Sequence, residues 1–247
     1  GYTVDITKRN AALEELKGTK FSVIRDGNVV LLDNGEVTSG TEITERYMSE
    51  GYHTYDITEN STIENSAYVN ILEGKFIRVY TELTDTGVLK IKDQDGNTSK
   101  QYFEIYEGNM HNTRGAKLLD RNEYKDLYNK VSVRAEDYDQ DGIYKLSVTV
   151  INPVSIFVEV QKQQVGKNGE GIPNTKFSIV RDENSKHEGV FTNDRGTFDF
   201  KEEEIKTGDY TYTIKELEPA SSKYVNILQD KYVEVYIRVK ADGSIII

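Results

Sequence analysis

The stretch TKFSVIRD at Thr19–Asp26 returns as TKFSIVRD at Thr175–Asp182, with only two aliphatic positions exchanged. A second anchor, YVNIL, occupies Tyr68–Leu72 and then Tyr224–Leu228, at the same spacing from the first anchor in both copies. Self-similarity over this length is the mark of a structural unit that occurs more than once in a chain. The repeat therefore predicts at least two units of the same fold.

Three further pairs of segments extend the match. They are VDITK ending at Lys8 with VEVQK ending at Lys162, GYHTYDITE ending at Glu59 with GDYTYTIKE ending at Glu216, and KFIRVYTEL from Lys75 with KYVEVYIRV from Lys231. The second copy stops at Ile247, level with Ile91 of the first, so residues 92–152 have no counterpart. We expect the second unit to be truncated at its C-terminal end.

The repeated segments alternate apolar with polar residues and are rich in β-branched and aromatic side chains. Turn signals such as Asp95-Gly96 and Asp141-Gly142 stand between them. This pattern predicts an all-β fold of antiparallel strands and hairpins, arranged as tandem immunoglobulin-like or prealbumin-like β-sandwiches. One segment differs, because Asp120 is placed to cap a short helix that carries the apolar stripe Tyr124, Leu127 and Tyr128.

We expect two domains from these features. The first is an enlarged sandwich over residues 1–153 with an insertion at about 94–145, and the second is a sandwich over residues 154–247. The segment 94–152 either adds strands and the helix to the first sandwich or forms a separate small domain.

Composition excludes several classes of protein. The chain has 247 residues, 36% hydrophobic and 30% charged, with a formal net charge of −11 and no cysteine. Lys and Arg are interspersed with acids, which is unlike the basic footprint of a nucleic-acid-binding protein. No apolar run approaches the roughly 20 residues of a membrane helix, and no targeting segment is present in these residues. The absence of cysteine excludes disulfides, thiol catalysis and cysteine metal sites.

A lysine and a glutamate occupy core-facing positions in each copy. Side chains alternate along a strand, so Lys8 shares a face with Val4 and Ile6, and Glu59 shares a face with Tyr55 and Ile57; Lys162 and Glu216 repeat this arrangement. Isolated buried charges are costly, so such a lysine and glutamate should form an ion pair, exchange a proton toward neutrality, or be consumed chemically. A neutral amine is a nucleophile and a neutral carboxylic acid polarises a carboxamide, which would yield an amide cross-link.

These motifs resemble a known family. The pattern V-x-V-x-K, a later K-F-S-[VI] strand, and Y-x-I-x-E followed by Pro and Tyr are similar to collagen-adhesin B-type (Cna B, prealbumin-like) domains of Gram-positive surface proteins and pilins. The second copy matches better because it retains Pro219 and Tyr224, whereas the first keeps Tyr68 but has no proline there.

The resemblance implies an intramolecular isopeptide bond between a first-strand lysine and a last-strand Asn or Asp, assisted by the glutamate. Lys8 and Lys162 would be the nucleophiles, and Glu59 and Glu216 the assisting acids. We choose Asn152 as the acceptor for Lys8, because it continues the face of Leu146, Val148 and Val150 at the end of the last strand; Asp93 is the rival.

Two alternatives remain for these residues. Lys8 and Glu59 could lie at the rim of a sandwich, where they would form an ordinary ion pair of little energetic value. In the second unit we expect Lys162 and Glu216 to be an unreacted pair, because residue 247 falls short of either acceptor position.

Metal and catalytic motifs are weak in this sequence. Asp137, Asp139 and Asp141 copy the start of a calcium loop, but the twelfth position is Val148 rather than Glu. We favour a solvated acidic turn, with calcium as the one cofactor that the sequence allows. The three histidines are far apart, and no nucleophile-elbow, Walker or dinucleotide motif appears. We therefore do not expect this protein to be an enzyme.

The resemblance implies a structural stalk region of a Gram-positive adhesin or pilin, displayed outside the cell and attached to the cell wall. Its partners would be neighbouring repeats of the same polypeptide and a host extracellular ligand, with no nucleic acid and no membrane insertion. The alternative is a ligand-binding adhesin module that recognises a host protein or glycan through the inserted segment. An exposed aromatic or apolar patch on residues 100–130 would favour that alternative. A carbohydrate-active enzyme would need a catalytic module that this sequence lacks.

Overall fold

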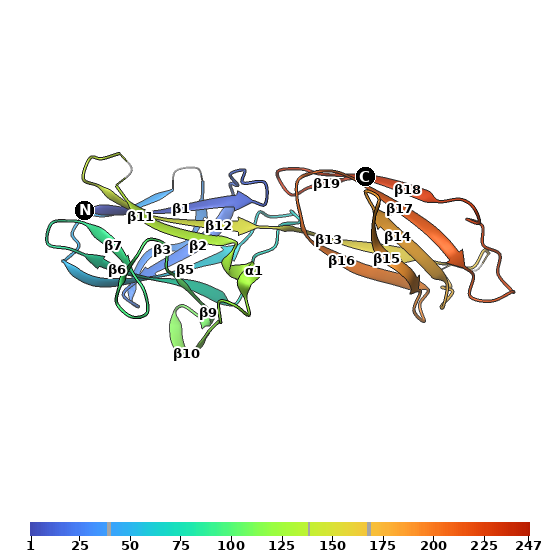
Figure 1. The fold of residues 1–247 in the computed structure, drawn as a ribbon, viewed down its shortest axis with the longest axis horizontal. Helices are drawn as coiled ribbons and strands as arrows, with labels where there is room; N and C mark the ends of the chain where they lie inside the picture. Colours follow the sequence, from blue (N-terminus) through green and yellow to red (C-terminus); the bar gives the residue numbers. More distant parts are fainter. Residues whose placement is uncertain (39–40, 138, 167–168) are drawn as a thin grey trace. The chain divides into compact units, whose positions relative to one another are not determined.

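The structure is a computed structural model that describes residues 1–38, 41–137, 139–166 and 169–247. The chain divides into two compact units, Gly1–Pro153 (unit 1) and Val154–Ile247 (unit 2) (Figure 1). Both are built almost entirely from strands, which confirms the all-β prediction. No helix in the described part of the chain is long and apolar enough to cross a membrane.

The described residues of unit 1 form twelve strands and one short helix. They are β1 (Tyr2–Asn10), β2 (Thr19–Arg25), β3 (Val29–Val37), β4 (Glu42–Glu45), β5 (Gly51–Ser61), β6 (Lys75–Leu83), β7 (Leu89–Lys92), β8 (Thr98–Ser99), β9 (Glu104–Asn109), β10 (Asn112–Leu118), α1 (Lys125–Tyr128), β11 (Val131–Glu136) and β12 (Tyr144–Asn152).

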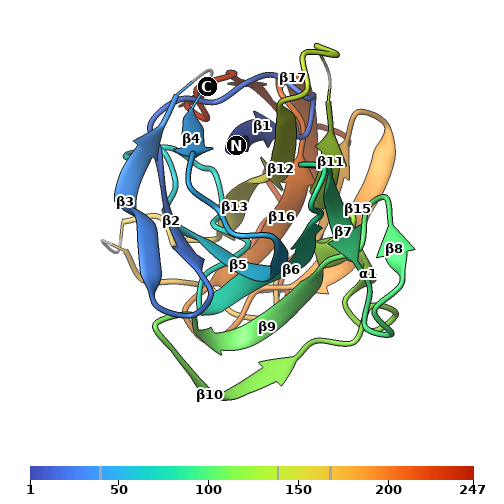
Figure 2. The same ribbon diagram turned by 90° about the vertical axis from the view of Figure 1, so that its left-hand side faces the viewer.

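Two sheets form unit 1. A four-stranded sheet has the order β11-β12-β1-β4, and a larger sheet has the order β10-β9-β6-β5-β2-β3, with β7 and β8 attached beside β6. Figure 2 shows the two layers on either side of the interior. Apolar residues from both sheets pack between them and include Val4, Ile57, Ile77 and Val148, all at 0% exposure. The core therefore lies between the layers, as in other sandwiches.

The pairing of β1 with β12 corrects the prediction of antiparallel strands. β12 runs parallel to β1 over its whole length, from Tyr2 opposite Tyr144 to Asn10 opposite Asn152. Parallel neighbours need a crossover connection rather than a hairpin, and here the connection is the whole of the rest of unit 1. The first and last strands of the unit therefore lie side by side.

The inserted segment belongs to both sheets of unit 1. β9 pairs with β6 and extends the larger sheet, whereas β11 and β12 belong to the smaller one. The expected helix is one turn, α1, and the Asp120 carboxylate accepts hydrogen bonds from the N–H groups of Asn122 and Glu123 just before it. Tyr128 is buried, donates to Leu119 O and accepts from Ile105 N–H, which anchors this turn to the sheet.

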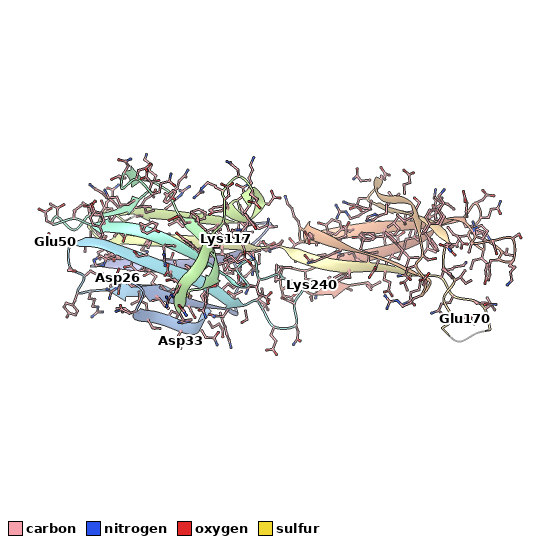
Figure 3. The ribbon with its side chains drawn as sticks, turned by 90° about the horizontal axis from the view of Figure 1, so that it is seen from below. Asp26, Asp33, Glu50, Lys117, Glu170 and Lys240 are labelled. Carbon is pink, nitrogen blue, oxygen red and sulfur yellow. The ribbon has the colours of Figure 1, made fainter. Side chains whose placement is uncertain are left out.

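Both edge strands of the larger sheet of unit 1 carry exposed charges. Asp33 on β3 and Lys117 on β10 are exposed and are labelled in Figure 3. Charged side chains on an edge strand oppose pairing with strands of other molecules. These two edges are therefore poor places for strand addition.

Unit 2 contains β13 (Val154–Gln161), β14 (Lys176–Arg181), β15 (Asn184–Phe191), β16 (Thr197–Ile205), β17 (Gly208–Glu218), β18 (Val233–Val239) and β19 (Ile245–Ile246). β13 and β16 form a two-stranded sheet, and the other strands form a sheet of order β15-β14-β17-β18-β19. These pairings repeat those of β1 with β4 and of β3-β2-β5-β6-β7 in unit 1. The repeated sequence motifs thus lie on strands that pair in the same order in the two units.

The TKFS motif performs the same local role in both units. Phe21 and Phe177 are buried, and each motif ends in an aspartate with a positive φ angle, 52° for Asp26 and 47° for Asp182. Asp26 Oδ1 accepts the N–H of Thr54 at 2.9 Å, and Asp182 Oδ1 accepts that of Thr211 at 2.8 Å. Asp tolerates this left-handed backbone and bonds to nearby N–H groups, so the motif fixes one strand end to its neighbour.

Candidate functional site

Lys8, Glu59 and Asn152 meet in the interior of unit 1. Lys8 Nζ lies 3.4 Å from Glu59 Oε2, and neither side chain is exposed. Asn152 Nδ2 donates to Glu59 Oε1 at 2.5 Å, and Lys8 Nζ donates to Val150 O at 3.2 Å. Glu59 therefore contacts both Lys8 and Asn152 away from water.

Three strands bring these groups together. Lys8 lies on β1, Glu59 on β5 of the opposite sheet, and Asn152 at the end of β12. The parallel register places Val150 opposite Lys8, so Asn152 lies two residues further along and on the same face. Glu59 reaches across the interior from the larger sheet and contacts both.

Burial shifts the pKa values of the acid and the base in opposite directions. It lowers the pKa of the Lys8 ammonium to about 7, because desolvation outweighs the attraction of Glu59. Burial also raises the pKa of the Glu59 carboxyl above its usual range, although Lys8 and Asn152 partly oppose this. Both shifts favour a neutral amine beside a neutral acid, which is the protonation state that attack on a carboxamide requires.

Unit 2 contains the same pair. Lys162 Nζ donates to Glu216 Oε2 at 2.8 Å, and the Glu216 side chain is 1% exposed while that of Lys162 is 14% exposed. Glu216 Oε1 makes no hydrogen bond with any residue that the structure describes. In unit 1 the corresponding oxygen of Glu59 binds Asn152.

An asparagine in each YVNIL motif positions the glutamate, and sequence reasoning did not assign it this role. Asn70 Nδ2 donates to Glu59 O at 2.9 Å, and Asn226 Nδ2 donates to Glu216 O at 2.9 Å. The side-chain oxygens of Asn70 and Asn226 in turn accept hydrogen bonds from the backbone N–H groups of Leu72 and Leu228. The signal available in the sequence was the recurrence of YVNIL at a constant spacing from the TKFS motif in both copies.

A second buried polar cluster joins the two sheets of unit 1. Arg25 Nε on β2 lies 2.6 Å from Glu45 Oε2 on β4, and the Tyr55 hydroxyl on β5 donates to the same oxygen at 3.0 Å. The Tyr2 hydroxyl hydrogen-bonds to that of Tyr55. We call Arg25, Glu45 and Tyr55 the inter-sheet clasp of unit 1.

Unit 2 has an equivalent clasp. Glu202 on β16 forms an ion pair with Arg181 on β14 and accepts a hydrogen bond from the Tyr212 hydroxyl on β17 at 2.9 Å. Sequence reasoning missed both clasps, because the segments around Glu45 and Glu202 do not align visibly. The other two members of each clasp, an arginine and a tyrosine, do recur in the repeated motifs.

The rival acceptor Asp93 is engaged elsewhere. It follows β7, and its Oδ1 accepts the N–H groups of Asp95 and Asn97 at 2.9 Å each within a hairpin turn. Among the two candidates, Asn152 is the one whose side chain is bonded to Glu59. The geometry therefore favours Asn152.

The carboxylates of Asp137 and Asp141 accept hydrogen bonds from the backbone of their own turn. Asp137 accepts the N–H groups of Asp141 and Gly142, and Asp141 Oδ1 accepts that of Ile143. Within the described residues no group of three or more Asp, Glu, His or Cys side chains could hold a metal ion. Asp137, Asp139 and Asp141 thus do not gather as calcium ligands in this structure.

The inserted segment does not present an apolar patch. Over residues 100–130, all of which are described, Leu118 at 47% is the single large hydrophobic residue that is exposed. Phe103, Met110 and Leu119 are buried. The feature that would favour a ligand-binding role for this segment is therefore missing there.

Comparison with known proteins gives structural similarities only. No family model and no curated protein matches the sequence. The C-terminal fragment of the pilus adhesin SpaC from Lactobacillus rhamnosus GG is 14% identical, with a TM-score of 0.33 over 98% of this chain and 82% of that one.

Two further structures match at a similar level. The Bacillus anthracis TIE protein is 17% identical with a TM-score of 0.35, over 98% of this chain and 32% of that one. BcpA, the major pilin subunit of Bacillus cereus, is 11% identical with a TM-score of 0.24, over 99% and 91% of the two chains. The solved structures that this chain resembles thus include pilins and a pilus adhesin. The proposed function rests on the geometry of the buried site.

Proposed function

We propose that the chain is a load-bearing structural region of a Gram-positive cell-surface pilin or adhesin, and that unit 1 is closed by an amide bond between Lys8 Nζ and Asn152 Cγ. The observation that carries the proposal is the buried contact of Lys8 and Asn152 with Glu59. A structural region of this kind needs no catalytic turnover, and the reaction occurs once per molecule.

The chemistry follows from the protonation state of the site. The neutral Lys8 amine attacks Asn152 Cγ while Glu59 donates its proton to the carboxamide. The new C–N bond forms, the C–N bond to Nδ2 breaks, and ammonia leaves with the protons that Lys8 gives up through Glu59. Exclusion of water prevents hydrolysis of the carboxamide and strengthens each electrostatic contact.

The position of the bond determines its mechanical effect. It would join the first strand of unit 1 to its last, and these two strands already lie side by side in parallel. A force applied to the two ends of unit 1 would then pass from β1 to β12 through a covalent bond. The hydrogen bonds of the sheets would carry none of that load.

Single-molecule force spectroscopy on the 247-residue chain, held at both ends, tests this function. We expect unit 2 to extend and the segment between residues 8 and 152 to stay closed at every force below covalent rupture. Lys8→Ala should release that segment, which adds roughly 500 Å at about 3.5 Å per residue. Full extension of the unsubstituted chain at ordinary unfolding forces would refute the proposal.

A further inference from the structure

His53 on β5 joins the end of β2 to the connection between β4 and β5. Its Nδ1 lies 2.9 Å from Asp26 Oδ2, and its Nε2 lies 2.8 Å from the backbone oxygen of Ser49. Asp26, labelled in Figure 3, closes the TKFSVIRD motif, and Ser49 lies in the connection formed by residues 46–50. His53 is 8% exposed, so protein atoms rather than bulk water satisfy both of its ring nitrogens.

Both partners of the His53 ring are hydrogen-bond acceptors. A backbone oxygen never donates, so Nε2 must carry hydrogen in order to bond to Ser49 O. Burial raises the pKa of Asp26, but the hydrogen bonds from His53 and from the N–H of Thr54 outweigh burial and hold that pKa below its ordinary value. Because Asp26 is therefore ionised, Nδ1 must carry hydrogen as well. The arrangement is that of the doubly protonated imidazolium.

The charges beside the ring also favour the imidazolium. Arg25 Nη1 lies 3.4 Å from Asp26 Oδ2, and Arg25 Nε lies 2.6 Å from Glu45 Oε2. The imidazolium and the guanidinium therefore stand together against the carboxylates of Asp26 and Glu45. Loss of the ring proton would leave the Arg25 guanidinium between these two carboxylates with its charge only half sufficient, and nearby carboxylates oppose such a loss.

Other titratable or charged groups come from the remaining elements around His53. The clasp contributes the hydroxyls of Tyr55 and Tyr2, and burial raises the pKa of both, so they stay neutral. On β6 the residue opposite His53 is Thr81, which does not titrate. Exposed charges on the connection and on a cavity that His53 borders are Arg46, Glu50, Lys92, Asp93 and Glu104. The ring nitrogens themselves bond to Asp26 and Ser49, so the protonation of His53 is coupled first to Asp26.

Unit 2 makes the equivalent contact with a phenol. GYHTYDITE aligns with GDYTYTIKE, so Tyr210 occupies the position of His53 and Lys206 that of Ser49. The Tyr210 hydroxyl donates to Lys206 O at 2.7 Å. Burial raises the pKa of Tyr210 above its ordinary value, so this hydroxyl keeps its hydrogen at physiological pH. The same position thus holds the connection before β5 and before β17, with a side chain that titrates near neutral pH in unit 1 and one that does not in unit 2.

We propose that His53 is a pH-dependent latch, which as the imidazolium holds residues 46–50 to Asp26 and releases them when it loses a proton. A neutral ring donates one hydrogen bond, so it keeps Asp26 or Ser49 and presents a lone pair to the other oxygen. Histidine changes its charge between about pH 5 and 8, so the latch opens as the pH rises through this range. It also fails in strong acid, where Asp26 is protonated, and the lowered pKa of Asp26 places that loss below the ordinary range of an aspartate. His53 takes no part in the proposed cross-link, so this inference goes beyond the proposed function and does not depend on it.

The test is NMR spectroscopy of the nitrogen-labelled 247-residue chain, titrated from about pH 5 to about pH 8. The ring nitrogen shifts report which nitrogens of His53 carry hydrogen, and heteronuclear NOE values report the motion of residues 46–50. We expect both ring nitrogens to be protonated at the acidic end. As one proton is lost, the NOE values of residues 46–50 should fall to those of a mobile loop. His53→Tyr, which copies unit 2, should keep them high at every pH, whereas the same change at the exposed His111 should leave the response intact.

Three outcomes would overturn this inference. They are an unprotonated ring nitrogen of His53 at the acidic end, NOE values of residues 46–50 that do not change with pH, and a pH response that survives His53→Tyr. If His53→Tyr does not fold, His53→Gln serves instead, because its amide is a smaller donor that does not titrate, and a pH response that persists in it overturns the latch equally. The mass of each variant reports the Lys8–Asn152 bond separately, so the two proposals can fail independently.

Discussion

The side-chain amide of Asn152 donates a 2.5 Å hydrogen bond to Glu59 Oε1, although the two residues belong to opposite sheets and are 0% and 2% exposed. Lys8 contacts the other oxygen of the same carboxylate. Glu59 thus bridges the amine and the carboxamide that we propose to react. Its protonation state decides whether the site is a static ion pair or a cross-linking site.

Replacement of Glu59 by glutamine should prevent the cross-link. The glutamine side chain would fill the same space but has no acidic proton to deliver to Asn152, so the ammonia should stay on the protein. We expect the mass of the Glu59→Gln variant to equal that calculated from its sequence. Formation of the cross-link at an unchanged rate would show that Glu59 has no part in it.

Unit 2 provides the matched control for that substitution. Glu216→Gln makes the same change beside Lys162, where no acceptor is bonded to the glutamate among the described residues. We expect this variant to lose one ammonia, which is also the result that we expect for the unsubstituted chain. A failure to lose it would point to a general folding effect of such substitutions.

Replacement of Asn152 by aspartate should preserve the cross-link and change the leaving group. The aspartate side chain would still present a carbonyl carbon to Lys8, and the protonated Glu59 would assist the departure of water rather than ammonia. Mass spectrometry of the Asn152→Asp variant should show the loss of one water. A variant that keeps its full mass would argue against Asn152 as the acceptor.

Replacement of Asn152 by alanine should destabilise unit 1. The proposed cross-link would close a loop of well over one hundred residues, and a disulfide that closes a loop of about 100 residues stabilises by about 4.7 kcal/mol in the chain-entropy description. We expect a loss of roughly 5 kcal/mol, seen in calorimetry as a fall of the unit 1 transition by about 10 to 20 °C. An unchanged unit 1 transition would contradict a covalent closure. Asp93→Ala is the control, because the Asp93 side chain hydrogen-bonds within its own turn.

The rate of cross-link formation should have a bell-shaped dependence on pH. Lys8 must lose its proton, and burial lowers its pKa to about 7; the rate should therefore rise as the pH increases toward that value. Glu59 must keep its proton, and burial raises its pKa, so the rate should fall at higher pH where the carboxyl ionises. The two limbs belong to the pair as a whole. To measure this rate, unlinked chain is denatured at a pH at which the reaction does not occur and is then refolded in a series of buffers from acidic to alkaline pH. Mass spectrometry follows the loss of ammonia over time in each buffer. A rate that does not change with pH would exclude proton transfer within the pair.

Disruption of the inter-sheet clasp should destabilise unit 1 without affecting the cross-link. Glu45→Ala removes the carboxylate that contacts Arg25 Nε and accepts from the Tyr55 hydroxyl, so that among the described residues Arg25 keeps only Asp26 and Tyr55 only Tyr2. Removing one partner of a buried ion pair costs about 3 kcal/mol or more, which denaturant unfolding would detect. The loss of ammonia should persist, because the clasp does not contact Lys8 or Asn152. Glu202→Ala is the equivalent change in unit 2.

Local patterns predicted the residues of the site but not their full arrangement. Alternation alone placed Lys8 and Glu59 on core-facing positions, because a strand determines which side chains share a face. Alternation allowed both Asn152 and Asp93 as acceptors, and the position of Asn152 at the end of the last strand before the second unit favoured it over Asp93. The parallel pairing of β1 with β12 was not predictable, because strand partners are chosen by contacts between distant segments, and turn signals report only the hairpins.

The clasp residue Glu45 illustrates the same limit. Its neighbours along the chain carry no repeated motif, and its role arises from the pairing of Glu45 with Tyr2 across β4 and β1. Asn70 is different, because its repetition in YVNIL was visible and only its contact with the Glu59 carbonyl required coordinates. Repetition thus indicated which positions matter, and the structure shows what they touch.

Intact-mass spectrometry of the denatured 247-residue chain is the most direct test of the Lys8–Asn152 bond. We predict the mass calculated from the sequence less one ammonia, and after proteolysis one branched peptide in which Lys8 is joined to Asn152. Both signals should vanish in Lys8→Ala. A chain at its full calculated mass, with linear peptides covering residues 8 and 152, would contradict the account.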